Sequence, residues 1–298
     1  MRTMAPRIAV IGEAIVALML HPDQREPYLG PFPSGAPCIF ASAASRLGCD
    51  VAMAMSVGAD EFGDLMRSSL AEHGVDLTRA HVDEAHPTSA AFIRYREDGS
   101  RTFIFYLEGT AAVRFPMDRV EGFLEEADWL HVSGSTLAFG GEMGEAAERA
   151  LRHAQQGGIA YSFDPNVRPE AFDAERMERL REHVRGAAIV FASDGELEAL
   201  QLKPEALVAA GTIVCRKHGR GGASILVDGA WIRVQTPTVE EVDPDGAGDN
   251  FAAGFVVAYL VGRDPLRAAE FAVAIASDSV TVHGPMSSRI QPIAELVF

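Results

Sequence analysis

The sequence predicts an α/β fold in which a mostly parallel β-sheet is covered by helices on both faces. Short apolar, β-rich runs alternate with stretches of helical spacing along most of the 298 residues. Strands separated by helices pair in parallel, because each crossover helix returns the chain to the end of the sheet where the strand began. No internal repeat or interdomain linker interrupts this alternation, so we expect a single domain over residues 1–298.

The N-terminal part of the chain begins this pattern with elements whose ends carry recognisable signals. A helix is predicted over 36–47, because Pro37 lies in its first turn and Gly48 follows its last residue. Residues 21–35 are rich in Pro and Gly and therefore predict a loop. The other elements expected here are strands over 7–11, 15–20 and 51–57 and a helix over 60–73.

A pair of β-rich runs then interrupts the alternation. Residues 88–95 and 101–106 are joined around Asp98-Gly99, a dipeptide typical of tight hairpin turns. A hairpin between strand–helix units does not fit into a parallel sheet, and it therefore predicts a small additional sheet.

From Trp129 the alternation resumes and continues through the rest of the chain. A second hairpin is predicted over 223–227 and 231–234, around Asp228-Gly229. Asp264-Pro265 supplies the cap and the first residue of a last helix that extends to about Val282. The remaining predictions are strands over 129–132, 159–163, 188–191 and 212–216 and helices over 141–156, 175–184, 196–200, 205–209 and 247–260.

Composition and charge exclude several classes of protein and partner. A net charge of −16 disfavours nucleic acid and anionic membranes as partners. No apolar run is long enough to cross a bilayer, and residues 1–6 are too few before the first strand for a signal peptide. Three cysteines without CxxC spacing argue against a disulfide framework or a zinc site. We therefore expect a cytoplasmic protein.

The stretch 243–254, DPDGAGDNFAAG, is the strongest candidate for a phosphate-binding site. Small residues at 246–248 leave their N–H groups open to a ligand, and the apolar run that follows predicts a helix beginning there. The first N–H groups of such a helix attract anions. Asp249 then has two interpretations, a first-turn residue that caps the helix or a general base beside a phosphoryl group. Spacing alone leaves both open.

Other polar residues follow predicted strands, which is where the active sites of α/β sheets lie. Asn166 and Arg168 fit either a phosphate or sugar site or an ordinary turn. Glu196 begins a short helix, where it either binds Mg²⁺ through water or stabilises the helix dipole. The segment 217–222 has three glycines and two cations and either borders a nucleotide or links two strands. No GxGxxG, P-loop or GxSxG motif is present.

Taken together, these motifs resemble those of the ribokinase-like (PfkB) family of carbohydrate and nucleoside kinases. The resemblance covers nearly the whole chain, and its most specific part is Gly246-Ala247-Gly248-Asp249 with Phe251 and Gly254. The other similar segments, in chain order, are Gly12-Glu13, Ser34-Gly35-Ala36-Pro37 ahead of Arg46-Leu47-Gly48, Gly58-Ala59-Asp60-Glu61-Phe62-Gly63 with Gly74-Val75-Asp76, and Asp164-Pro165-Asn166-Val167-Arg168.

The resemblance implies a three-layer α/β/α fold with a small β lid, inserted at about 13–34 and 86–110. It implies transfer of the γ-phosphate of ATP to a hydroxyl of a monosaccharide or sugar acid, with fructose-like and 2-keto-3-deoxygluconate-like acceptors as the models. ATP and Mg²⁺ are the implied cofactors, and a monovalent cation is compatible with them. Because the lid of such kinases often forms a dimer interface, we expect a homodimer joined through it.

The same resemblance assigns roles to single residues. Asp249 would be the general base, and the N–H groups of Gly246, Ala247 and Gly248 would form the anion hole. The residues expected to contact the nucleotide are Asn166, Lys217, Gly219, Gly222, Gly246 and Gly248, and Glu196 is expected at the metal. Those expected to bind the sugar are Gly35, Ala36, Tyr106, Arg168 and Asp249.

Several positions differ from the usual pattern of the family and leave the acceptor open. Ala17 and Ile39 stand where the family often has Asp and Asn, and Leu107 stands where an Arg often follows the lid tyrosine. Asp245 replaces a common Thr and adds a negative charge near the phosphate. A nucleoside kinase of the same fold, or a non-catalytic protein that binds a sugar or nucleotide, therefore remains an alternative.

Overall fold

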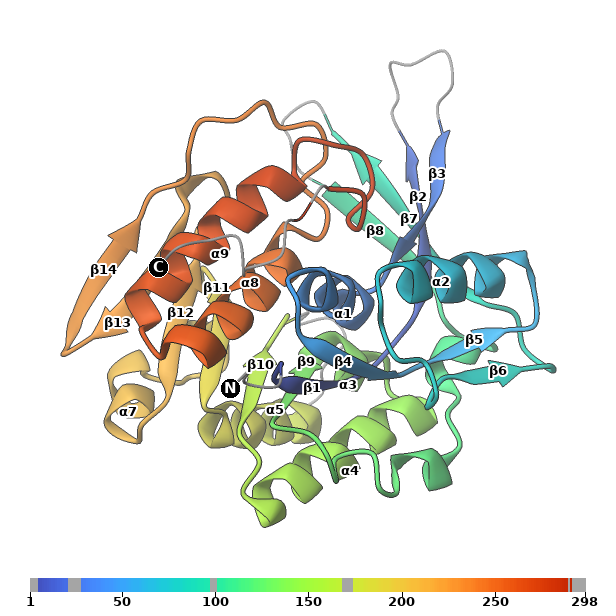
Figure 1. Cartoon of the computed structure of the whole chain (residues 1–298), viewed down its shortest axis with the longest axis horizontal. Helices are drawn as coiled ribbons and strands as arrows, with labels where there is room; N and C mark the ends of the chain where they lie inside the picture. The colour runs from blue at the N-terminus through green and yellow to red at the C-terminus, as the bar shows by residue number, and fades with distance from the viewer. Residues whose placement is uncertain (1–4, 21–27, 97–100, 168–173, 289, 291–298) are drawn as a thin grey trace.

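The computed structural model describes residues 5–20, 28–96, 101–167, 174–288 and 290, and an eight-stranded sheet forms its centre (Figure 1). Its strands are β1 (Arg7–Ile11), β4 (Asp50–Ala54), β9 (Trp129–Ser133), β10 (Tyr161–Asp164), β11 (Ile189–Ser193), β12 (Ile213–Lys217), β13 (Ala223–Val227) and β14 (Ala230–Val234). The order is β14-β13-β12-β11-β10-β9-β1-β4. The strands from β12 to β4 are parallel and only β13 and β14 pair antiparallel, which confirms the predicted mostly parallel sheet.

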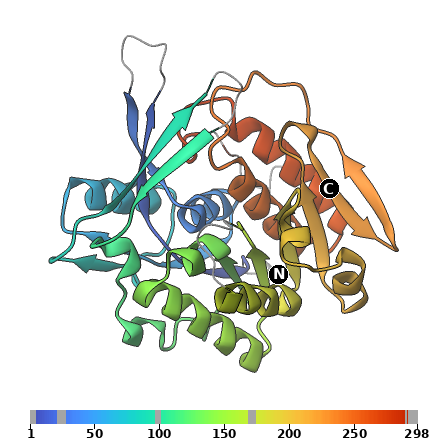
Figure 2. The ribbon, with the colours of Figure 1, turned by 180° about the vertical axis from the view of Figure 1, so that it is seen from behind.

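Helices cover both faces of this sheet. They are α1 (Ala36–Arg46), α2 (Glu61–Glu72), α3 (Gly134–Phe139), α4 (Gly141–Gly157), α5 (Ala174–Gly186), α6 (Glu196–Ala199), α7 (Pro204–Ala209), α8 (Ala247–Gly262) and α9 (Pro265–Ser279). Helices α1, α8 and α9 pack on one face of the sheet and α4 and α5 on the other, above and below strands β1 and β9 in Figure 1, and Figure 2 shows the same layers from behind. None of the helices that the structure describes is long and apolar enough to cross a membrane.

The alternation of side chains along each strand builds two separate cores. Ile8 and Val10 of β1 pack in one core with α1, α8 and α9, whereas Ala9 and Ile11 pack in the other with α4 and α5. The sheet is therefore buried on both faces, as is typical of parallel sheets. This confirms the three-layer α/β/α arrangement.

Helix α8 is apolar on almost all sides because it lies between the sheet and its neighbouring helices. Its residues from Asn250 to Ala258 are all buried. A side chain at Gly254 would place its Cβ 3.1 Å from the Cα of Ala272 in α9, so the glycine lets the two helices pack closely. This packing fixes the position of the N-terminus of α8.

A second sheet of four strands, which we call the lid sheet, projects from the layered body (Figures 1 and 2). It contains β2 (Ile15–Leu20), β3 (Tyr28–Ser34), β7 (Ser89–Tyr95) and β8 (Arg101–Tyr106) in the order β3-β2-β7-β8. The predicted hairpin is confirmed, since β7 and β8 pair antiparallel from Ala90–Tyr106 to Tyr95–Arg101.

The strand β3 corrects the prediction of a loop over 21–35. Pro31 and Pro33 lie within it and cannot donate backbone hydrogen bonds, but β3 is an edge strand, where such residues are tolerated. The residues 21–27 of the predicted loop lie outside the described part of the chain.

A few other elements differ from the prediction in extent. The strand predicted over 51–57 is broken at Met55, because its second half leaves the central sheet to form a separate pair. The pair consists of β5 (Ser56–Gly58) and β6 (His81–Asp83), and β6 was not predicted. Helix α3 was not predicted either, and α9 ends at Ser279 rather than near Val282.

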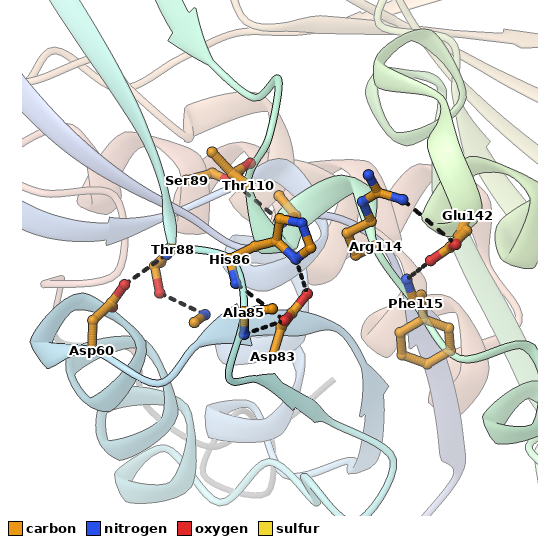
Figure 3. Close-up of polar contacts among 12 residues, drawn as sticks. Asp60, Asp83, Ala85, His86, Thr88, Ser89, Thr110, Arg114, Phe115 and Glu142 are labelled. Atoms are coloured by element: carbon orange, nitrogen blue, oxygen red, sulfur yellow. Dashed lines mark hydrogen bonds and ion pairs between the residues drawn. The ribbon is translucent and has the colours of Figure 1, made fainter.

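Hydrogen bonds at the base of the β7–β8 hairpin tie the lid sheet to the body (Figure 3). The Asp60 carboxylate caps α2 by accepting from the Gly63 N–H (2.8 Å), and it also accepts from the Thr88 N–H (2.7 Å). The hydroxyls of Ser89, at the start of β7, and Thr110, after β8, are 2.6 Å apart. These contacts fix the place where the hairpin leaves the body.

Candidate active site

The carboxyl ends of the parallel strands bring charged residues to one edge of the central sheet. Glu13 follows β1, Asp164 ends β10 and Lys217 ends β12. The Lys217 ammonium donates to the Asp164 carboxylate, and it lies 3.3 Å from the place where a side chain at Gly248 would begin. The N-terminus of α8 therefore lies directly beside this edge, as the position of ligand sites in α/β sheets predicts.

Gly246 sets the start of α8 through its conformation and its lack of a side chain. It is the N-cap residue and has a φ of 72°, in the left-handed region. A Cβ at this position would lie 2.5 Å from the Cβ of Pro285 and 3.0 Å from the Cδ1 of Ile39. Glycine is therefore required here both by the backbone and by the space available.

The N–H groups at the start of α8 form what we call the anion cradle. No acceptor among the described residues binds the N–H groups of Gly246, Gly248 and Asp249, and the N–H of Ala247 makes only a 3.5 Å contact with the carbonyl of Pro244. These donors lie at the positive end of the dipole of a 16-residue helix. The cradle can therefore accept an anion such as a phosphate.

Asp249 lies in the first turn of α8 beside the cradle. Burial raises the pKa of its carboxyl well above the usual value, and the nearby carboxylates of Asp164, Asp245 and Glu13 raise it further, while Lys217 acts in the opposite direction. Among the described residues, no N–H or O–H group donates to this carboxylate. Asp249 therefore does not cap the helix through a hydrogen bond, and it keeps its acceptor sites for a ligand.

A pocket lies between the lid sheet and the anion cradle. Its polar lining residues are Glu13, Ser34, Ser135, Asn166, Asp245 and Asp249. The lid sheet contributes apolar side chains that alternate along β7 and β8, namely Ala91, Ile93, Phe103 and Phe105. The rest of the lining comes from Ile15, Gly35, Ala36, Ile39 and Phe139. Of the residues predicted for the sugar, Gly35, Ala36 and Asp249 meet here.

Glu13 is a buried residue of the pocket lining. Its buried carboxylate accepts hydrogen bonds from the hydroxyls of Ser135 (2.7 Å) and Thr136 (2.5 Å), which lie just after β9. The sequence motifs predict no role for these hydroxyls, although their position directly after a predicted strand is a usable signal. Nor do the motifs predict Phe103 and Phe105, although the alternation along β8 would have placed both on one face of the lid sheet.

Glu196 connects two strand ends. One carboxylate oxygen accepts from the N–H of Val167 (2.7 Å) and the other from the N–H of Ser193 (2.6 Å). Burial and the charge of Asp164 raise the pKa of this carboxyl, whereas Lys217 and the two N–H groups lower it. Each oxygen retains a lone pair for a metal-bound water, which fits the predicted water-mediated contact. No group of three or more metal-ligating side chains occurs among the residues described.

Of the residues predicted for the site, Gly35, Ala36, Asn166 and Asp249 line the pocket, and among those that do not, three lie on the outer side of the lid sheet or in the segment after Lys217. Tyr106 is 60% exposed and lies on the opposite face of β8 from Phe105, because successive side chains of a strand point to opposite sides. Gly219 lies in a short turn after Lys217, in open space. Gly222 packs against β14, where a Cβ would lie 2.2 Å from the carbonyl oxygen of Val234. Arg168 lies outside the described residues.

A groove of about 600 Å³ lies elsewhere, along α2 and β6. Its lining includes Asp64, Leu65, Arg67 and Leu77. None of the residues predicted for the active site lines it, and we do not assign it to the reaction.

Comparison with known proteins identifies the family of this fold and site. The model of the pfkB family carbohydrate kinases matches residues 5–292. A fructokinase from Escherichia coli is 32% identical over 273 residues, which cover 85% of this chain and 84% of the relative. A 2-dehydro-3-deoxygluconokinase from Thermoproteus tenax is 28% identical (96% and 91% covered), and an ATP-dependent ribose-1-phosphate kinase from Halopiger xanaduensis is 30% identical (88% and 84%).

Solved structures show the same architecture with nucleotide bound. A putative ribokinase II from E. coli, in complex with ATP and Mg²⁺, has a TM-score of 0.86 and 33% identity, with 98% of this chain and 97% of that chain covered. A fructokinase variant from Vibrio cholerae, with fructose, ADP and potassium ion bound, has a TM-score of 0.83 and 26% identity, with 98% of each chain covered. The chain therefore belongs to the pfkB family of carbohydrate kinases, phosphotransferases that act on an alcohol group of a sugar.

Proposed function

We propose that this protein transfers the γ-phosphoryl group of ATP to a hydroxyl of a neutral, fructose-like monosaccharide. The observation that carries the proposal is the carboxylate of Asp249, which lines the pocket, accepts no hydrogen bond from a described residue and adjoins the open N–H groups of the anion cradle. A general base and an anion site within one pocket are the two parts that phosphoryl transfer to an alcohol requires from a protein.

The proposed step moves one proton and one phosphoryl group. The acceptor hydroxyl gives its proton to an oxygen of Asp249 as its own oxygen forms the bond to the γ-phosphorus. The bond from that phosphorus to the β–γ bridging oxygen breaks, and ADP leaves with the electron pair. The N–H groups of Gly246, Ala247 and Gly248 stabilise the charge on the phosphoryl oxygens. The raised pKa of Asp249 brings its basicity closer to that of an effective base at neutral pH.

The nucleotide phosphates fit the cradle because Gly246 and Gly248 present no side chain to it and Lys217 supplies a positive charge beside it. We propose that Asn166, which lines the pocket, contacts the phosphates as well. A bound Mg²⁺ ion would neutralise phosphate oxygens, and Glu196 would hold it through a water molecule. In this proposal Gly219 and Gly222 shape the turn that follows Lys217 rather than touch the phosphates.

The charges of the pocket favour a neutral acceptor over a sugar acid or a sugar phosphate. Three carboxylates line the pocket, those of Glu13, Asp245 and Asp249. A carboxylate or phosphate on the acceptor would add a further negative charge at short range, and like charges repel strongly where burial lowers the dielectric. Among the acceptors named for the relatives, fructose therefore fits better than 2-dehydro-3-deoxygluconate or ribose 1-phosphate.

A nucleoside is the second candidate acceptor. Phe103 and Phe105 from the lid sheet, together with Phe139 and Ile39, give the pocket an apolar wall in addition to its carboxylates. A flat aromatic base could pack on such a wall while the ribose hydroxyls face the polar side. Fructose, which carries hydroxyls on both faces, gains less from this wall.

The test is release of ADP from ATP with a panel of fructose, ribose, 2-dehydro-3-deoxygluconate, ribose 1-phosphate and adenosine. We expect the highest kcat/KM with fructose, and a loss of at least about 100-fold in kcat in Asp249→Asn. Asp264→Asn is the matched control, because Asp264 caps α9 away from the pocket, and it should leave kcat unchanged. No turnover of any acceptor by the wild type, or equal turnover by Asp249→Asn, would overturn the proposal. Binding of ATP without turnover would indicate a sensor instead.

We also propose that the protein forms a homodimer through the outer face of the lid sheet, the face turned away from the pocket. The alternation of the strands places Tyr28, Ile104 and Tyr106 there, and they are 59%, 50% and 60% exposed. Leu18 and Phe92 pair in register on the same face. An exposed apolar sheet face of this kind is typical of a protein–protein interface, and a two-fold dimer covers it with its own copy.

A further inference from the structure

The far end of the β7–β8 hairpin contacts the loop that leads into the anion cradle. Tyr95 and Arg101 are directly opposite each other in register, and Arg101 shares the pocket-facing side of β8 with Phe103. The Tyr95 hydroxyl donates to Oδ1 of Asp243 at 2.5 Å, and the Arg101 guanidinium lies 3.8 Å from Oδ1 of Asp245. The hairpin is thus attached at its tip as well as at its base.

The loop side of this contact is buried and connected to the site. Asp243 is 1% exposed, and its carboxylate also accepts from the N–H groups of Asp245 (3.0 Å) and Gly284 (2.9 Å). Asp245 lines the pocket and immediately precedes Gly246, the first residue of the cradle. The far ends of β7 and β8 therefore contact the loop residues that lead directly into the cradle.

We propose that Tyr95 and Arg101 are positioning residues of the phosphoryl-transfer site, which join the lid sheet to the loop 243–245 and so hold both walls of the pocket around the acceptor. The proposal rests on the function proposed above, in that the acceptor binds between the lid sheet and α8. Neither side chain touches the reacting atoms, and both act through Asp243 and Asp245.

Arg101 has a second, electrostatic part in this arrangement. Asp245 is a negative charge next to the cradle, its side chain is only 12% exposed, and a charge buried to that extent is weakly screened by water. The guanidinium of Arg101 offsets it. Without this guanidinium, the Asp245 charge would oppose the phosphates of ATP and the ionisation of the nearby Asp249 more strongly.

The kinetic test uses Tyr95→Phe and Arg101→Gln with the panel acceptor that has the highest kcat/KM. We expect the KM for that acceptor to rise about 10-fold in each, the typical consequence of losing a contact to a charged group, and the KM for ATP to rise as well in Arg101→Gln, while kcat stays within about threefold at a pH well above the acid limb. Arg96→Gln is the matched control, because the hydrogen bonds of Arg96 remain within the hairpin, to Thr102, and its KM should not change. Unchanged KM in both variants, or an equal rise in Arg96→Gln, would overturn the proposal.

A double variant separates the positioning part from the electrostatic part. In Arg101→Gln/Asp245→Asn both charges are absent, so we expect the KM for ATP to return to within about threefold of the wild-type value, while the KM for the acceptor stays raised because the contact between the lid sheet and the loop is still missing. Additive losses in the double variant would contradict the charge pairing.

Hydrogen exchange tests the tip contact even if no panel acceptor is turned over. In the absence of substrate, the backbone amides of β7 and β8 should exchange at least about threefold faster in Tyr95→Phe and Arg101→Gln than in the wild type and Arg96→Gln, with the central sheet unchanged. Equal exchange in all four proteins would overturn the contact. Faster exchange in a protein without any kinase activity would uphold the contact and reject only the proposed function.

Discussion

At the scale of single residues, the surroundings of Asp249 decide what its carboxylate can do. It lies among the carboxylates of Asp164, Asp245 and Glu13, with Lys217 as the opposing charge. Burial and these negative charges make ionisation harder, so the pKa of Asp249 is raised from the value near 3.9 of a free aspartate. The pairing of Lys217 with Asp164 limits how far this lysine compensates.

The pH dependence of kcat/KM should report this environment. A general base works only when deprotonated, so activity is present above its pKa and is lost as the pH falls through it. Because the pKa of Asp249 is raised, we expect the acid limb to lie above the pH range in which a free aspartate titrates. Asp245→Asn removes one of the raising charges and should move this limb to lower pH. Asp264→Asn, remote from the site, should leave it in place, and an unmoved limb in Asp245→Asn would contradict the assignment of Asp249 as the base.

At the scale of elements, the first turn of α8 contains the anion cradle and Asp249, and the shape of this turn depends on Gly246. Gly246→Ala would place a Cβ against Pro285 and Ile39 and require a non-glycine residue at a φ of 72°. The conformation alone costs about 1–2 kcal/mol, and relief of the contacts would displace the N–H groups of the cradle. We expect a loss of about 2 kcal/mol in the free energy of unfolding and a kcat reduced about 100-fold.

Gly262→Ala provides the matched control at the other end of the same helix. Beyond the adjoining helix backbone, no atom of the described residues lies within 4 Å of a Cβ there, so alanine should be neutral or stabilise the protein by up to about 1 kcal/mol. Urea unfolding and steady-state kinetics on both variants make the comparison. Equal effects of the two substitutions would show that α8 tolerates change at its start and that the cradle is not built as described.

The capping residue of α2 has a second effect, because it also holds the base of the lid sheet (Figure 3). Asp60→Ala should lower the free energy of unfolding by about 1–2 kcal/mol through loss of the cap. The Asp264 carboxylate caps α9 in a comparable way, since it accepts from two N–H groups. Asp264→Ala should therefore lower the free energy of unfolding by a similar amount. Only Asp60→Ala should raise the KM for the acceptor. A raised KM in both, or in neither, would show that Asp60 does not position the lid sheet.

At the scale of the whole molecule, the lid sheet has two faces with different partners. The inner face covers the pocket with Phe103 and Phe105, and the outer face presents Ile104 and Tyr106 to solvent. A dimer that uses the outer face would fix the lid sheets of two copies against each other.

Ile104→Glu tests this dimer. A buried, unpaired carboxylate opposite its own symmetry mate strongly disfavours association, so analytical ultracentrifugation should show a dimeric wild type and a monomeric variant. Val261→Glu is the matched control, since Val261 is 53% exposed at the end of α8, away from the lid sheet, and should leave the dimer intact. A monomeric wild type, or a dimeric Ile104→Glu, would exclude the proposed interface.

Much of the architecture was predictable because it depends on local patterns. Periodicity identified the strands of the central sheet and most of the helices, and Asp98-Gly99 indicated the β7–β8 hairpin. The stretch 243–254 predicted a helix start with open N–H groups, which the structure shows at α8. The motifs also predicted the pfkB family, which the comparisons confirm. Each of these features is fixed by residues close together in the chain.

What the sequence by itself determined is therefore the order of strands and helices, the start of α8 with its open N–H groups and the family. Only the tertiary structure decided that β3 is a strand at an edge, that Phe105 rather than Tyr106 faces the pocket, and that Glu196 bonds to the N–H groups of Val167 and Ser193. It alone joined Tyr95 to Asp243, 148 residues away in the chain. Such contacts depend on which elements pack together, and that is set by the burial of whole faces rather than by any local pattern.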